Sequence, residues 1–205
     1  MKLIFKITAF AMIAMLLTGC SGQNKQEINN ITEDELPYGA TMRENKTSYA
    51  VPITYDRRFV EEEQVAAVAN YFSAIQNQDV DLYLENALPI YTEYQINYVY
   101  SYDDTSELVN GLHEGIATQT GEDFVFQMIL INEFSQDRNF GGLEAMLDLL
   151  DNAIASDIKF SEQIQGAWAL ELELDFLYDK QANFGSVDSQ WVYLFKLDDK
   201  YYCCM

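Results

Sequence analysis

Residues 167–178, AWALELELDFLY, place an apolar side chain at every second position of a long segment. Glu171, Glu173 and Asp175 occupy positions between these apolar residues. A period of two is the pattern of a β-strand that buries one face and exposes the other. The segment therefore predicts a long strand whose apolar face, containing Trp168 and Leu172, meets the rest of the domain. The three carboxylates are predicted to lie on the opposite face, in contact with water.

Three further segments are predicted to be strands because they are rich in β-branched and aromatic residues. They are residues 123–134, 189–197 and 200–205. The first is almost continuously apolar, so it is predicted to be covered on both faces. Asp198-Asp199 is predicted to form a two-residue turn in the last hairpin, and Gly185-Ser186 to lie in a longer loop.

Helical spacing is clearest in residues 61–79, which are predicted to form the first helix. Asp79 is predicted to cap a short second helix that Pro89 stops. The apolar face of the first helix contains Val65, Val68, Phe72 and Ile75. That of the second contains Val80, Tyr83, Leu84 and Ala87.

Two more helices are predicted further along the chain. Asp104 and Glu107 have the spacing of a capping box, and Gly121 marks the exit of the helix that follows them. The other helix is predicted within residues 141–156, where leucines and a methionine recur with helical spacing. Helices gathered before long strands are typical of an α+β fold. We expect the helices to pack on a curved, mainly antiparallel sheet.

The domain is expected to span residues 56–205, a length that buries about 70% of the unfolded surface without disulfides. Residues 20–55 are polar and lack a sustained apolar period, so they are predicted to form a tether. From Pro37 onward this segment carries apolar residues, which allow part of it to lie against the domain.

The N-terminus has the features of a secretory signal. Lys2 and Lys6 precede an apolar run that is too short to span a membrane. Leu17-Thr18-Gly19-Cys20 resembles the bacterial lipobox, which implies that residues 1–19 are removed and that Cys20 receives diacylglycerol. The alternative is an ordinary signal peptide with an incidental cysteine. The lipobox reading predicts a bacterial lipoprotein of the cell envelope, anchored to a membrane through the lipid on Cys20 and exposed outside the cytoplasm.

Charge and cysteine content exclude several classes of function. The formal charge is -21, and removal of residues 1–19 makes it -23 because Lys2 and Lys6 are lost with no acid. This charge repels nucleic acid, so no nucleic-acid partner is expected. Cys203 and Cys204 are neighbours on a predicted strand and are expected to be free thiols. With His113 as the single histidine, no metal site and no cofactor are predicted.

The order of elements resembles the cone-shaped superfamily that includes nuclear transport factor 2, ketosteroid isomerase and scytalone dehydratase. The resemblance rests on VANYFSAIQNQDVDLYLENALP, residues 68–89, and on the final hairpin WVYLFKLDDKYYCCM, residues 191–205. It covers about residues 57–205 and implies a pocket between the helices and the concave face of the sheet. Two departures are the inserted helix within 139–156 and the tyrosine-rich segment 91–102.

Enzymes of this superfamily place an acid, a base or a tyrosine in an apolar pocket. Here His113 lies beside the apolar stripe of its helix and is predicted to be a boundary residue. Tyr91, Tyr94 and Tyr98 have helical spacing and are expected to pack with their hydroxyls at the rim. No catalytic residue is therefore predicted. The candidates considered are His113, Tyr91, Tyr94, Tyr98, Tyr100, Tyr102, Glu171, Glu173 and Asp175.

The chain contains no G-x-S-x-G, Walker, G-x-G-x-x-G or H-E-x-x-H motif. The domain is therefore predicted to bind a small apolar or mixed ligand in the pocket, or another envelope protein at the sheet face. The alternative is an enzyme of the isomerase, dehydratase or hydrolase type that uses an acid or a tyrosine in the pocket. A pocket containing a buried ionisable group would favour the enzyme, whereas an exposed aromatic patch would favour a partner-binding module.

Overall fold

A computed structural model describes residues 43–120, 123–153, 158–178, 180 and 182–205. The predicted signal peptide, Cys20 and the tether up to residue 42 lie outside the described residues. So do Gly121 and residues 154–156, at the predicted ends of two helices. In the part of the chain that the structure describes, no helix is long and apolar enough to cross a membrane.

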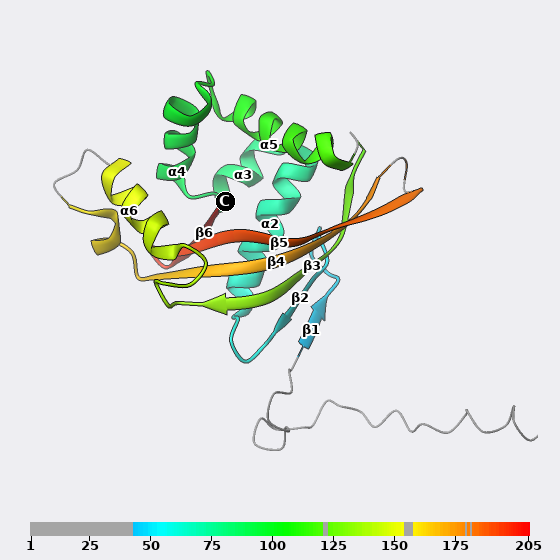
Figure 1. Cartoon of the computed structure of the whole chain (residues 1–205), viewed down its shortest axis with the longest axis horizontal. Coiled ribbons are helices and arrows are strands. Elements are labelled where there is room, and N and C mark those ends of the chain that lie inside the picture. Colours follow the sequence, from blue (N-terminus) through cyan, green and yellow to red (C-terminus); the bar gives the residue numbers. More distant parts are fainter. Residues whose placement is uncertain (1–42, 121–122, 154–157, 179, 181) are drawn as a thin grey trace, which may run out of the picture. The chain divides into compact units, whose positions relative to one another are not determined.

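Two short strands come first in the described chain, and most of the helices precede the long strands (Figure 1). The strands are β1 Arg43–Lys46, β2 Ile53–Asp56, β3 Val125–Ser135, β4 Gly166–Tyr178, β5 Asn183–Leu197 and β6 Lys200–Cys204. The α-helices are α2 Glu62–Asn77, α3 Val80–Asn86, α4 Pro89–Tyr94, α5 Thr105–Thr120 and α6 Leu143–Ala153. A π-helix, η3 Gln95–Tyr100, continues α4, and a 3₁₀ turn, η4 Phe160–Glu162, follows α6.

The six strands form one sheet in the order β1-β2-β3-β4-β5-β6. Neighbouring strands are antiparallel except β2 and β3, whose parallel register pairs Ile53 with Ile129 and Thr54 with Leu130. The sheet is mixed and does not close into a barrel. The predicted α+β class with a mainly antiparallel sheet is confirmed.

The first two strands come from the segment that the sequence assigned to the tether. Val51 and Ile53 are completely buried, and Tyr55 is almost so. β1 pairs with β2 along its whole length and forms one edge of the sheet. The sheet therefore begins at Arg43, before the predicted domain start at residue 56.

The N-terminal caps predicted at Asp79 and Asp104 are present, and α2 has a further cap that was not predicted. Glu61 and Gln64 form a capping box at the start of α2, and Asp79 Oδ1 accepts a hydrogen bond from the Leu82 backbone N–H at 3.0 Å at the start of α3. Asp104 Oδ1 likewise accepts from the Glu107 N–H at 3.0 Å ahead of α5. These carboxylates satisfy N–H groups that have no partner within the helix. The assignment of Leu84 to a buried face was wrong, because its side chain is exposed.

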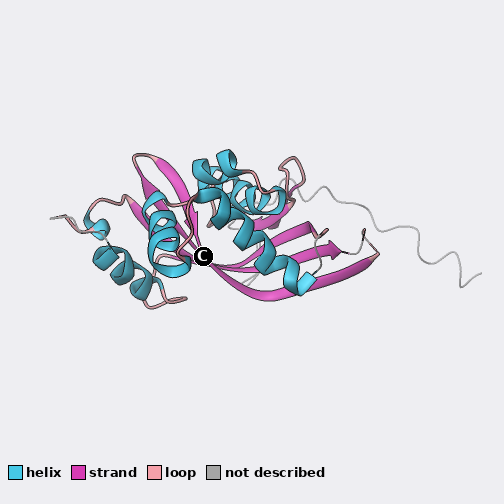
Figure 2. Cartoon of the chain, turned by 90° about the horizontal axis from the view of Figure 1, so that it is seen from above, coloured by secondary structure: helices cyan, strands magenta, loops and turns pink. Residues whose placement is uncertain are grey.

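The main core lies between one face of the sheet and helices α2, α3 and α5. Figure 2 shows helices lying over the strands. Alternation in β4 works as predicted and buries Trp168, Leu170, Leu172, Leu174 and Phe176 on this face. Phe72 of α2 is completely buried against them. The main core therefore forms where the apolar faces of the helices pack on the apolar face of the sheet, as the periodicities of the sequence predicted.

A second, smaller core lies on the opposite face of the sheet and involves α6, which stands apart from α2 and α5 (Figure 1). Leu143, Leu147 and Leu150 of α6 pack there with Ala169 and Phe195, which alternate with residues of the main core. The opposite face is therefore not entirely exposed to water. Near the start of β4 it is covered, and the acids of β4 lie further along the strand.

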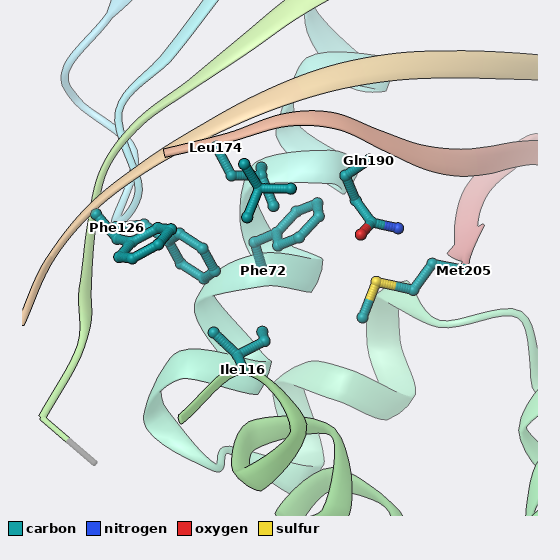
Figure 3. Close-up of a pocket in the computed structure, with 8 residues that line it drawn as sticks. Phe72, Ile116, Phe126, Leu174, Gln190 and Met205 are labelled. Atoms are coloured by element: carbon teal, nitrogen blue, oxygen red, sulfur yellow. The ribbon is translucent and has the colours of Figure 1, made fainter. Parts of the chain in front are cut away.

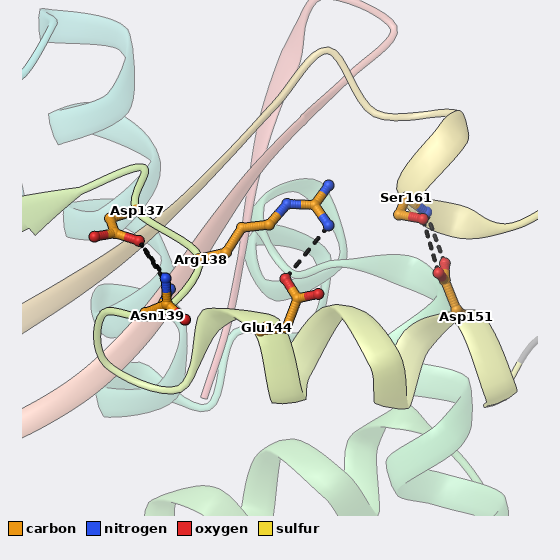
Figure 4. Close-up of polar contacts among 6 residues, drawn as sticks. All are labelled: Asp137, Arg138, Asn139, Glu144, Asp151 and Ser161. Carbon is orange, nitrogen blue, oxygen red and sulfur yellow. Dashed lines mark hydrogen bonds and ion pairs between the residues drawn. The ribbon is translucent and has the colours of Figure 1, made fainter.

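Polar contacts hold the segment around α6 (Figure 4). Arg138 Nη1 pairs with Glu144 Oε2 at 3.3 Å, and the Ser161 hydroxyl donates to Asp151 Oδ2 at 2.7 Å. The Tyr193 hydroxyl donates to the Gly141 carbonyl at 2.8 Å and so fixes the loop before α6 to β5. This helix was predicted from its leucine spacing, and its start at Leu143 follows two glycines with positive φ.

The expectation that β3 is covered on both faces was wrong. Its register with β4 shifts twice, between Phe126 and Met128 and between Ile131 and Glu133. Each shift inserts an extra residue into β3 and changes which side chains face the core. The near-continuous apolar run therefore belongs to a strand that is bent and buried mainly on one face.

Gly185-Ser186 does not lie in a loop, as the sequence suggested, but inside β5. Gly185 is paired with Phe176 of β4, and Ser186 with Asp175. The Asp198-Asp199 turn is confirmed, and both residues have positive φ. This is the geometry of the tight turns that match the twist of a hairpin.

Candidate functional site

A small, partly enclosed pocket lies between α2, α5 and the strands β3, β4 and β5 (Figure 3). Phe72 and Phe126 meet edge to face in it, with ring centroids 5.5 Å apart. Ile116 approaches from α5, on the other side from Leu174 of β4. The complete lining is Phe72, Ile116, Phe126, Leu174, Phe176, Val187, Gln190 and Met205.

An irregularity in β5 brings two of these residues to the pocket. Leu172 pairs with Gln190 and Leu174 with Val187, so β5 carries one more residue than β4 between these pairs. In a regular strand, residues three positions apart point to opposite faces. The bulge allows Val187 and Gln190 to line the same pocket. This bulge was not predicted, because Gly185-Ser186 was assigned to a loop and the strand was expected to begin at Ser189.

The pocket is apolar except for Gln190. The Nε2 group of Gln190 donates to the Trp191 backbone oxygen at 3.0 Å. Among the described residues, no donor reaches its Oε1 atom, which can accept a hydrogen bond from a ligand. None of the lining side chains is ionisable. This lining can bind an apolar group with one donor, but its side chains supply no acid or base.

The cavity volume is about 80 Å³. Pockets that enclose whole drug-sized molecules are usually about 300–1,000 Å³. Met205 is one of the lining residues, and a methionine side chain adapts easily because it is unbranched. The pocket is therefore suited to the end of an apolar chain or to a small ring.

His113 lies on α5 outside this pocket and is half-buried. Its Nδ1 atom is 3.1 Å from the Ile75 backbone oxygen, and its ring packs at 4.8 Å from the ring of Phe124. Phe124 in turn contacts Phe126, so one aromatic ring separates His113 from the pocket lining. The structure places His113 at the boundary of the core, as the helical spacing predicted.

The three acids of β4 do not line the pocket. Glu171, Glu173 and Asp175 alternate with the core residues and lie on the opposite face of the strand, each half-buried. Glu171 Oε1 accepts a hydrogen bond from the Ser189 hydroxyl at 2.6 Å. Neither His113 nor any of these carboxylates lines the pocket.

The five candidate tyrosines form two stacks near the turn between α4 and α5. Ring centroids are 6.2 Å apart for Tyr91 and Tyr94 and 5.8 Å apart for Tyr94 and Tyr98. Tyr100 and Tyr102 stack at 5.2 Å. Burial raises the pKa of Tyr91 well above its ordinary value, which keeps this hydroxyl neutral. None of the five lines the pocket, although helical spacing correctly grouped Tyr91, Tyr94 and Tyr98.

Cys203 and Cys204 are free and buried, as expected. Burial raises the pKa of both thiols. A buried thiol of raised pKa is a poor nucleophile because the thiolate is the reactive form. Within the described ranges, no group of three His, Cys, Asp or Glu side chains is arranged to hold a metal ion.

Comparison of the chain with protein-family models, with curated proteins and with solved structures gives no match.

Proposed function

We propose that this protein is a bacterial lipoprotein, anchored outside the cytoplasm through a lipid on Cys20, whose domain binds the end of an apolar ligand. We further propose that the domain is a cone of the nuclear transport factor 2 type. The α2–α3 pair, the final β5–β6 hairpin and the position of the pocket between helices and sheet support this assignment.

The observation that carries the binding function is the chemistry of the pocket lining. Apolar and aromatic side chains surround the cavity, and Gln190 supplies a single polar group. Such pockets hold apolar ligands through burial of surface, and the few polar groups set orientation. The ligand class that fits is an elongated aliphatic molecule with a hydroxyl or amide near the buried end.

The enzyme alternative has less support. General acid or base catalysis requires an ionisable group within hydrogen-bond reach of the substrate. His113 and the acids of β4 lie elsewhere, and none of the side chains that line the pocket is ionisable. Binding without chemical conversion is therefore the proposed activity.

The proposal can be tested by adding decanol to a protein that comprises residues 21–205. Binding should perturb the methyl NMR signals of Ile116, Leu174 and Met205 and should raise the melting temperature. Val187→Phe places a ring in the cavity and should abolish both effects. Ser186→Phe is the matched control, since it adds the same ring to an exposed position of the same strand.

Decanol binding to wild type and Ser186→Phe, but not to Val187→Phe, would support the pocket as the site. Equal binding to all three proteins would place the alcohol elsewhere. Failure of wild type to bind decanol or a longer alcohol would contradict the proposed ligand class.

A further inference from the structure

The turn between α4 and α5 exposes consecutive apolar side chains. Tyr98 is 75% exposed, Val99 48% and Tyr100 47%. They form the last residues of the π-helix η3, and Ser101, which follows the helix, has a φ of 57°. The turn projects away from the sheet (Figure 1). We call Tyr94, Tyr98, Val99 and Tyr100 the tyrosine tip.

The rings of the tip are ordered by contacts within the protein. Tyr98 stacks on Tyr94, and Tyr100 stacks on Tyr102. Tyr102 packs against α5, where a Cβ atom on Gly111 would lie 2.5 Å from the Tyr102 hydroxyl. Side chains that are already ordered lose little conformational freedom when a partner binds. π-Helical turns are also frequent at functional sites.

The sequence on both sides of the tip is strongly acidic. Glu93 precedes Tyr94, and Asp103, Asp104 and Glu107 follow Tyr100 within seven residues, and all four are exposed. Across residues 59–137, which include α2 to α5, the sequence contains many acids and no lysine or arginine. An aromatic centre with an acidic rim complements a partner that is basic and partly apolar. The same charge repels a surface of anionic lipid.

We propose that the tyrosine tip docks a lysine- and arginine-rich segment of another protein. Arginine and lysine side chains can pack over the free ring face of Tyr98 while pairing with Glu93 and Asp103. Val99 and Tyr100 then cover the apolar residues of that segment. This surface lies on different residues from the pocket, so it does not depend on the proposed ligand.

The test uses the full chain in neutral detergent and a fluorescent peptide of repeated Lys-Leu-Arg, followed by anisotropy. Tyr98→Ser combined with Tyr100→Ser should weaken binding about tenfold or more, as expected for central aromatic contacts. The charge is unchanged, and circular dichroism checks that the fold is kept. Phe59→Ser combined with Phe184→Ser is the control, because both rings are exposed elsewhere.

Charge is tested separately with Glu93→Lys. This change should weaken binding of the peptide more than Glu133→Lys, an equal change on the exposed face of β3. A peptide with glutamate in place of lysine and arginine should not bind.

An equal loss of peptide binding in the tip variants and in their controls would overturn the proposal and indicate non-specific attraction. A second result would also overturn the proposal. If flotation with lipid vesicles requires Tyr98 and Tyr100 but binding of the basic peptide does not, the tip contacts a membrane surface and not a protein.

Discussion

Phe176 of β4 lies directly opposite Gly185 of β5, and a Cβ atom on Gly185 would stand 2.5 Å from Phe176 Cε2. An aromatic ring that covers a cross-strand glycine restores packing where the glycine has no side chain. This pair explains why a glycine occurs inside a long strand. It also fixes one wall of the pocket, because Phe176 belongs to the lining.

Gly185→Val is expected to push the Phe176 ring toward the cavity. Affinity for decanol should fall about tenfold, which corresponds to about 1.4 kcal/mol. Calorimetric titration measures this change. Ser186→Val, one position along the strand and exposed, should leave the affinity unchanged. A similar loss in both variants would indicate a general effect on β5 instead of a contact with Phe176.

Leu172→Ala should destabilise the domain strongly because Leu172 is completely buried in the main core. Removal of a buried leucine side chain costs about 2–5 kcal/mol. The melting temperature should fall by roughly 4–20 °C for a domain of this size. Glu173→Ala changes the next residue on the opposite face and should shift the free energy of unfolding by no more than about 0.5 kcal/mol. Equal effects would contradict the strand alternation.

Alkaline pH is expected to destabilise the protein through its buried thiols. An unfolded cysteine has a pKa of about 8.5, and burial raises the pKa of Cys203 and Cys204 in the folded state. Above about pH 8.5 the unfolded chain loses protons that the folded chain retains, so the free energy of unfolding falls as pH rises. Burial also raises the pKa of Tyr83, to about 12, which extends the effect above about pH 10.

Urea unfolding at a series of pH values measures how steeply the free energy of unfolding falls with pH. In Cys203→Ala combined with Cys204→Ala the overall stability is lower, but its decline between about pH 8.5 and about pH 10 should be shallower than in wild type. Parallel curves for the two proteins would show that the thiols do not cause the decline.

Cys20→Ala tests the proposed anchor, which rests on the sequence alone. The variant should leave the membrane fraction or accumulate as an uncleaved precursor, since acyl chains are the only strong membrane signal expected after cleavage. Cell fractionation shows whether the variant is in the membrane fraction, and its size on a gel shows whether the signal peptide has been removed. Membrane association of a processed variant would rule out the lipid anchor.

The sequence predicted best where local and tertiary requirements agree. Capping residues such as Asp79 and the alternation around Leu172 act locally, and the surrounding core favours the same structure. The bulge between Val187 and Gln190 was missed because it depends on pairing with β4, for which no local pattern exists. β1 was also missed, because an edge strand of charged residues lacks apolar alternation.

The same distinction applies to the candidate site. The positions of His113 and Glu171 followed from helix and strand periodicity alone. Gln190 was not recognised as part of the pocket, because one glutamine in a strand has no feature that distinguishes it from a solvent-facing residue. Only the three-dimensional arrangement of β5 against α2 and α5 places it beside Phe72 and Met205.

The short parallel contact between β2 and β3 determines how the domain responds to mechanical pulling. Tension transmitted along the chain from its N-terminal side enters the fold at β1, which is held to the sheet through β2. Two residue pairs, Ile53 with Ile129 and Thr54 with Leu130, make the register that joins β2 to β3. Tension applied at Arg43 would therefore peel off the β1–β2 hairpin first. The long β3–β4–β5 ladders and the pocket between them would stay intact, with β3 exposed as a new sheet edge.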